Sequence, residues 1–113
     1  MNFNNKLFYD DYAHHPTEIT AVLKACRTNF SKRKIISIFQ PHRYSRLKYL
    51  YNKFAKSFYS SDVVLLCPIY SAGEKKNNIS QYQLGKDIIK NSKTEVILVN
   101  NEVEIEKFLK KNL

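Results

Sequence analysis

The sequence predicts an α/β domain in which helices cover both faces of a mainly parallel sheet. Three observations support this fold class: strand-like and helix-like segments alternate along the chain, one strand-like segment is almost continuously apolar, and polar residues gather where strand-like segments end. Such alternation is typical of βαβ units with right-handed crossovers. With 113 residues, the chain has the size of a single domain.

Four short segments have the composition of strands. They are rich in apolar and β-branched residues and comprise residues 6–10, 34–40, 63–67 and 95–99. The third is the most apolar, as expected of a central parallel strand that is buried on both faces. The four strands, each followed by a helix, give four βα units.

Four segments have helical periodicity, since their apolar residues recur at spacings of three and four. We expect helices over residues 16–29, 45–58, 80–91 and 102–111. Pro16 suits a first helical position, where its missing N–H would have no partner anyway. Ser45 is the expected N-cap of the second helix. The inward positions are Ile19, Val22, Leu23 and Cys26; Leu47, Leu50, Tyr51, Phe54 and Phe58; Leu84, Ile88 and Ile89; and Val103, Ile105, Phe108 and Leu109.

The net charge of +9 raises the question of a nucleic-acid partner. The basic residues are dispersed, however, with small groups at 32–34, 75–76 and 110–111 that fall at expected turns and ends. Because nucleic-acid binders usually gather such residues on one face, we expect no nucleic-acid partner.

The apolar pattern argues against a membrane protein. The longest apolar run, residues 63–67, is far too short to span a bilayer, and the polar residues 1–5 do not resemble a signal peptide. Cys26 and Cys67 are expected to be buried thiols, and no Cys/His spacing indicates a metal site. We therefore expect a cytoplasmic protein with no membrane contact.

A run of chemically active residues, from Asp11 to Glu18, follows the first predicted strand. Open α/β sheets bind ligands at the carboxyl ends of their strands. There, Asp11 is suited to accept the hydroxyls of a ribose or to orient an imidazole, or else it bonds to nearby backbone as a turn residue. Tyr12 is suited to wall a small pocket. Of His14 and His15, we expect one to line a pocket and the other to bond to backbone, although both packing at the helix start and metal binding remain alternatives.

A second run of the same kind follows the second strand and contains His42, Arg43 and Arg46. Two guanidinium groups at a helix start form a receptor for a carboxylate or phosphate, which they bind in bidentate fashion. A helix start usually carries acidic residues, so two arginines there favour a function. A third run, residues 70–74, follows the third strand and is suited to bring Glu74 to the same edge; a solvated turn is the alternative.

The chain has only two glycines, Gly73 and Gly85, which is too few for the common glycine-rich phosphate-binding loops. Neither a GxGxxG nor a GxxxxGK[ST] pattern is present. The chain therefore has no standard means of binding a triphosphate.

These three runs together resemble the Mur ligase family of peptidoglycan synthesis, and in particular its alanine-adding branch. The segments that carry the resemblance are DDYAHHPTE at 10–18, FQPHRYSR at 39–46 and YSAGE at 70–74. The resemblance runs from about residue 6 to the end. It implies that residues 1–113 form the Rossmann-like C-terminal domain, which brings the amino acid, without its last strand region. It also implies that the family's N-terminal UDP-sugar-binding domain and central ATPase domain are not part of residues 1–113.

The resemblance also implies a reaction. ATP phosphorylates the carboxylate of UDP-N-acetylmuramic acid, and the amino group of L-alanine attacks the acyl phosphate to give an amide. Mg²⁺ is required, with its ligands mainly in the central domain, so this domain alone is expected to be inactive. A non-catalytic module of the same fold, binding a nucleotide or a protein, is the alternative.

Site residues are implied by position within the matching segments. Arg43 and Arg46 hold the alanine carboxylate, and Asp11 contacts the nucleotide ribose. The methyl pocket and the ammonium are assigned to three residues, Tyr12, His14 and His42. His15 and Glu74 are further candidates. No residue of this domain is assigned a covalent catalytic step, because its contribution is to position the amine.

Overall fold

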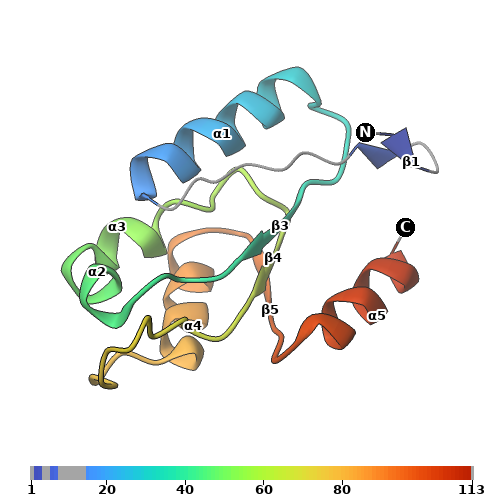
Figure 1. Cartoon of the computed structure of the whole chain (residues 1–113). Helices are drawn as coiled ribbons and strands as arrows, with labels where there is room; N and C mark the ends of the chain where they lie inside the picture. The colour runs from blue at the N-terminus through green and yellow to red at the C-terminus, as the bar shows by residue number, and fades with distance from the viewer. Residues whose placement is uncertain (1, 4–5, 8–14, 113) are drawn as a thin grey trace.

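The centre of the molecule is a parallel sheet of three strands. The computed structural model describes residues 2–3, 6–7 and 15–112. Strands β3 (Ile36–Phe39), β4 (Val63–Leu66) and β5 (Glu95–Leu98) lie in the order β3-β4-β5, all parallel (Figure 1). All four residues of β4 are at most 1% exposed, which confirms the predicted central strand.

One face of the sheet is covered by four helices: α1 (Pro16–Asn29), α2 (Tyr44–Tyr49), α3 (Tyr51–Ala55) and α4 (Gln81–Asn91). Their apolar side chains pack with Val64 and Leu66 into the larger core cluster. This cluster also contains three aromatic residues, Phe39, Phe54 and Phe58, and the ring of Phe39 contacts the other two at tilted angles. Helix α1 has the predicted bounds, α4 begins one residue later than predicted, and α2 and α3 lie within one residue of the range predicted for a single helix.

The opposite face is covered by α5 (Glu102–Asn112), on the far side of the sheet from α1 (Figure 1). Ile105 and Phe108 of this helix pack against a second cluster formed by Val63, Leu65, Cys67 and Val99. The domain therefore has three layers, helix, sheet and helix, as the sequence predicts.

Some predicted inward positions are wrong. Val103 is 59% exposed because it lies two residues, about 200° around the helix, from Ile105. Ile89 is 50% exposed because it sits about 100° from the fully buried Ile88, at the rim of the buried stripe. Cys26 is half-buried, whereas Cys67 is buried as expected.

The first predicted strand does not join the parallel sheet in the part of the chain that is described. Instead, β2 (Lys6–Leu7) pairs antiparallel with β1 (Asn2–Phe3). Only two residues separate these strands in the sequence, and such a short connection allows only antiparallel pairing. Residues 8–10 of the predicted strand lie outside the described residues. Among the described residues, the parallel sheet therefore contains three of the four predicted strands.

The second predicted helix is two short helices, interrupted at Leu50. This residue has φ −110° and ψ 19°, outside the helical range, and it ends α2 and precedes α3. Phe58 lies beyond α3 yet is 2% exposed, so the core position is right although the helix is shorter. The helix also begins at Tyr44, so Ser45 is not its N-cap. None of the helices in the described ranges is long and apolar enough to cross a membrane.

Candidate functional site

The loops after β3 and β4 meet at the carboxyl edge of the sheet. Beyond the strands, the amide of Tyr70 donates to the carbonyl of Pro41 at 2.9 Å, and the amide of Arg43 donates to the carbonyl of Tyr70 at 2.7 Å. His42 and Tyr70 form an isolated parallel bridge. The pairing of β3 with β4 thus continues into both loops, which brings the second and third polar runs together.

The aromatic rings of His42 and Tyr70 are in contact. Their centroids are 4.9 Å apart and their planes are inclined by 43°. Both residues are exposed, so the contact orients the His42 imidazole without removing it from solvent. An imidazole held in this way can present its ring nitrogens to a ligand at the sheet edge.

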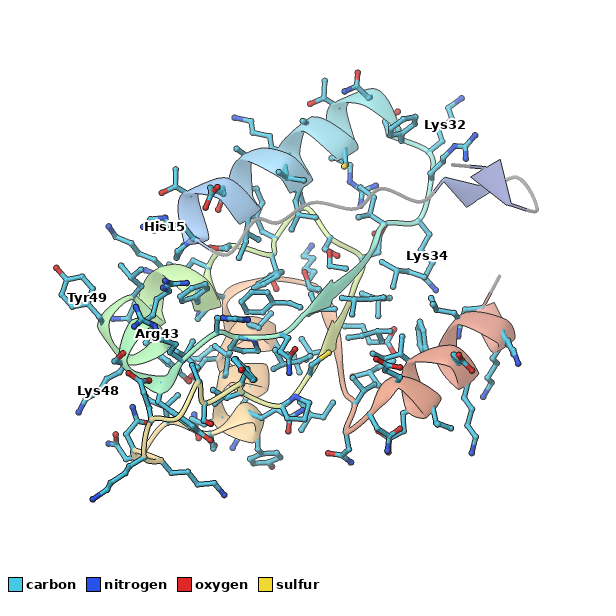
Figure 2. All side chains as sticks on the ribbon, in the orientation of Figure 1. His15, Lys32, Lys34, Arg43, Lys48 and Tyr49 are labelled. Atoms are coloured by element: carbon cyan, nitrogen blue, oxygen red, sulfur yellow. The ribbon has the colours of Figure 1, made fainter. Side chains whose placement is uncertain are left out.

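Arg43 has an uncommon backbone conformation. It is the N-cap of α2 with φ 68° and ψ 136°, and it makes no capping hydrogen bond with its side chain. A non-glycine residue in this region costs on the order of 1–3 kcal/mol and is found most often where the surroundings impose it for a function. The side chain is exposed and lies at the end of the molecule formed by α2 and α3 (Figure 2).

Glu74 occupies the start of α2 from the neighbouring loop. Its Oε1 accepts the amide of Ser45 at 3.1 Å, and its Oε2 accepts the Ser45 hydroxyl at 2.6 Å. The Ser45 hydroxyl is therefore committed to Glu74, which explains why it does not serve as the predicted N-cap. The acidic group that a helix start normally carries comes from another segment of the chain.

The same contacts lower the pKa of the Glu74 carboxyl. The largest cause is the hydrogen bond from the Ser45 hydroxyl, followed by the bond from the Ser45 amide, and the positive charge of Arg43 adds to them. The carboxylate is presented by a tight turn in which the Glu74 amide donates to the Ser71 carbonyl at 2.9 Å. Ala72 and Gly73, the central residues of this turn, have φ 51° and 84°.

Arg46 lies three residues after Arg43, in the first turn of α2, and is half-buried. Residues at this spacing lie on neighbouring positions of a helix surface. Because α2 has only six residues and its start is bonded to Glu74, the helix itself adds little positive potential. The two guanidinium groups therefore carry most of the positive charge at this helix start.

His15 is the N-cap of α1. Its Nδ1 accepts the amide of Thr17 at 3.2 Å, and its own amide donates to the Glu18 carboxylate at 3.2 Å, which completes a capping box. The carbonyl of Pro16 accepts a hydrogen bond from the Ser57 hydroxyl at 3.3 Å, so the start of α1 is tied to the segment that follows α3. His15 is thus the histidine that bonds to backbone.

Asp11, Tyr12 and His14 lie outside the described residues. Of the other candidates from the sequence, His42, Arg43 and Glu74 come together. Arg46 lies in α2, whose N-cap is Arg43, and His15 lies toward the same end of the molecule (Figure 2). Sequence reasoning missed Tyr70 as a partner of His42 and Ser45 as a partner of Glu74. Both lie within the polar runs already singled out, and the meeting of parallel strand ends was the available signal.

The described residues do not fit a Mg²⁺ site. In ranges 2–3, 6–7 and 15–112 no group of three or more His, Cys, Asp or Glu side chains is placed to hold a metal. Mg²⁺ binds through one or two carboxylates together with phosphates and water, and the Glu74 carboxylate is already bonded to Ser45.

A separate hollow of about 390 Å³ is lined mainly by basic residues, among them Arg27, Lys32 and Lys34. It lies away from these loops: Figure 2 shows Lys32 and Lys34 far from Arg43. The guanidinium of Arg27 in this hollow donates to Asp62 at 2.7 Å and to the Ser60 carbonyl at 3.0 Å. These bonds tie the end of α1 to the start of β4, so the arginine has a structural role.

Known proteins are similar to this chain in sequence and in fold. Residues 1–111 match the family model described as "Mur ligase, glutamate ligase domain". The chain is 50% identical over 107 residues to the UDP-N-acetylmuramate–L-alanine ligase of Pelagibacter ubique, covering 94% of the chain and 23% of that relative. It is 45% identical over 108 residues to the protein of the same name from a Sulfurihydrogenibium species, covering 95% and 24%.

The structural comparison agrees. The crystal structure of UDP-N-acetylmuramate-alanine ligase from Thermotoga maritima superposes with a TM-score of 0.64 at 30% identity, covering 87% of this chain and 19% of that one. The chain spans about a quarter of the length of the curated relatives it matches.

Proposed function

The chain belongs to the Mur ligase family, and on that premise we propose that it is the amino-acid-binding domain of an enzyme that joins L-alanine to UDP-N-acetylmuramic acid in peptidoglycan synthesis. The observation that carries the proposal is the arginine pair at the start of α2, with Arg43 held in place by the loop after β4. A guanidinium pair is suited to an amino-acid carboxylate.

The residues of this domain bind and orient the amino acid. Arg43 and Arg46 hold its carboxylate, and His42, fixed by the ring of Tyr70, borders the methyl group and the ammonium. Tyr12 and His14 complete the pocket, and Asp11 contacts the nucleotide ribose. His15 has a capping role that favours His14 as the pocket histidine. Correct placement of the amine against the acyl group is itself a large contribution to rate.

The other parts of the enzyme supply the activated acyl group. ATP transfers its terminal phosphoryl group to the carboxylate of UDP-N-acetylmuramic acid, and the amine displaces phosphate to form the amide. ATP phosphates and Mg²⁺ bind mainly to a central ATPase domain, and the sugar nucleotide binds to an N-terminal domain. Residues 1–113 act as the C-terminal domain of this cytoplasmic ligase and are inactive alone.

A chimaeric enzyme tests the proposal. The matching region of the Pelagibacter ubique ligase is replaced by this chain, and ligation of L-alanine is measured for Arg43→Ala and for the matched control Lys48→Ala, an exposed cation on the same helix. We expect Arg43→Ala to raise KM for L-alanine about tenfold or more, because a hydrogen bond to a charged group is lost. KM for ATP should stay the same.

The control variant should leave both constants unchanged. An unaltered KM for L-alanine in Arg43→Ala would contradict the carboxylate role. A folded chimaera that ligates no L-alanine would instead favour the alternative, a non-catalytic module of the same fold.

A further inference from the structure

The contact between Glu74 and Ser45 joins the loop after β4 to the first turn of α2, and the two residues are 29 positions apart in the sequence. Each carboxylate oxygen takes one hydrogen bond, from the amide and from the hydroxyl of the same serine. Two bonds to one residue fix the carboxylate in direction as well as in distance. The turn that carries it contains two residues with positive φ, Ala72 and Gly73, so the loop holds a specific conformation.

This loop holds the backbone on both sides of the Arg43 side chain. The amide of Arg43 itself is bonded to Tyr70, and the residue two positions later, Ser45, is bonded to Glu74. Arg43 lies between these anchors in its uncommon conformation, with φ 68°. The loop after β4 thus imposes the backbone angles that set the direction of the Arg43 side chain.

The same contact engages the Glu74 carboxylate with Ser45 and not with the Arg43 guanidinium. Arg43 is close enough for its charge to act on Glu74. Even so, among the described residues the Arg43 side chain forms no ion pair or hydrogen bond. An unrestrained glutamate beside an arginine would pair with it in bidentate fashion and compete with any carboxylate ligand. Ser45 instead binds both oxygens of Glu74 and holds the carboxylate in an orientation in which it forms no pair with Arg43.

We propose that Glu74 is a positioning residue for the amino-acid receptor: bound to Ser45, it fixes the start of α2 so that Arg43 is aimed and left available for the substrate carboxylate. Glu74 does not itself contact the amino acid. This inference rests on the proposed function, since it assigns to Glu74 the placement of an arginine that binds L-alanine.

The test uses the same chimaera with Glu74→Ala, Glu74→Gln, Ser45→Ala and the double variant Ser45→Ala/Glu74→Ala. Glu106→Ala, an exposed glutamate on α5, is the matched control. We expect Glu74→Ala to raise KM for L-alanine about tenfold, since a misplaced binding group loses most of its effect. The kcat at saturating L-alanine and KM for ATP should change by less than about twofold.

The conservative variant Glu74→Gln distinguishes a positioning role of Glu74 from a role in the stability of the fold. Glutamine keeps an oxygen that can accept the Ser45 amide, so Glu74→Gln should raise KM by only about threefold. The double variant should be no worse than Glu74→Ala, because both substitutions remove the same contact. A purely structural role would lower the yield of folded enzyme and leave the KM of the folded fraction unchanged.

The outcomes separate this inference from the proposed function. If Arg43→Ala raises KM for L-alanine and Glu74→Ala does not, positioning by Glu74 is wrong and the proposed function stands. If neither variant changes KM, the arginine receptor itself is wrong. If Glu74→Ala does not fold, the milder variants Glu74→Gln and Ser45→Ala provide the test. An unchanged KM for L-alanine in both of them overturns the positioning role of Glu74.

A second measurement does not need turnover. NMR spectra are recorded of the ¹⁵N-labelled 113-residue chain and of its variants. Glu74→Gln should shift the signals of the Arg43 amide and Nε relative to wild type, whereas Glu106→Gln should leave them unchanged. Equal spectra at Arg43 would overturn the inference even if the chimaera were inactive.

Discussion

The backbone amide of Arg43 donates a hydrogen bond of 2.7 Å to the carbonyl of Tyr70. The pair lies past the last paired residues of the sheet, where Phe39 of β3 is opposite Leu66 of β4. The parallel pairing of two central strands is therefore carried on into the loops that follow them. As a result, residues nearly thirty positions apart in sequence form one local structure at the sheet edge.

The ring of Tyr70 should matter for substrate binding through His42. The main chain of Tyr70 bonds to Pro41 and Arg43, and these bonds do not depend on the side chain. Tyr70→Ala therefore removes only the contact with the His42 ring, whose centroid lies 4.9 Å from that of Tyr70. We expect Tyr70→Ala in the chimaeric ligase to raise KM for L-alanine about threefold to tenfold, since ring contacts of this kind contribute on the order of 1 kcal/mol. Tyr70→Phe keeps the ring and should behave as wild type. Equal constants for Tyr70→Ala and wild type would show that Tyr70 does not orient His42.

Gly73 should be required for the turn that presents Glu74. Its φ of 84° is unfavourable for residues with a Cβ, although a Cβ there would meet nothing within 4 Å. Gly73→Ala should therefore destabilise the chain by about 1 kcal/mol through backbone strain alone. Ala72→Gly, at φ 51°, relieves strain at the preceding residue and is the matched comparison. Urea unfolding of both variants measures the difference, and a Gly73→Ala variant as stable as wild type would contradict the strained turn.

The sequence predicts most of this fold because the hydrophobic pattern is strong where burial is complete. Residues 63–66 are apolar without interruption and are buried on both faces, so pattern and structure agree. The hydrophobic pattern predicts burial less well at positions that are only partly covered. Ile89 and Val103 are apolar and near the buried stripe, but small rotations around a helix place them in solvent. A short antiparallel pairing such as Asn2–Leu7 carries almost no hydrophobic signal.

The site is predicted less completely, because its parts are joined by main-chain bonds that composition does not reveal. The sequence indicates that Arg43 and Glu74 lie at the same edge, since both follow parallel strands. It assigns Ser45 to helix capping, which is the common use of a serine at that position. In the structure the helix begins one residue earlier, with Arg43 as the N-cap at a φ of 68°, and no residue-type preference predicts that conformation for an arginine.

Gly85, in the middle of α4, should be replaceable by alanine. An alanine Cβ would lie 3.2 Å from the Leu98 Cδ2 and 3.4 Å from the Val96 Cγ1. Leu98 is 37% exposed, so its terminal methyl can move by the few tenths of an ångström required. The gain in helix stability of about 0.5–1 kcal/mol should then exceed the cost of the close contact. We expect Gly85→Ala to raise the free energy of unfolding slightly, whereas the larger Gly85→Leu should lower it. Destabilisation by alanine would mean that the packing of α4 on β5 is rigid.

The stability of the fold should depend on the ionisation of Asp62. Partial burial acts to raise the pKa of this carboxyl, but the bonds from the Ile35 amide and the Arg27 guanidinium, both 2.7 Å, outweigh it, so the pKa lies below its usual value. Because the folded pKa is depressed, the stabilisation is present above the unfolded pKa, near 3.9, and is lost as the pH falls through the folded value. The side chain is 41% exposed, so solvent screening limits the effect to about 1 kcal/mol. Between about pH 5 and pH 2, wild type should therefore lose more unfolding free energy than Asp62→Asn, as followed by urea unfolding at each pH. Parallel curves for the two proteins would show that the Arg27–Asp62 contact adds no stability.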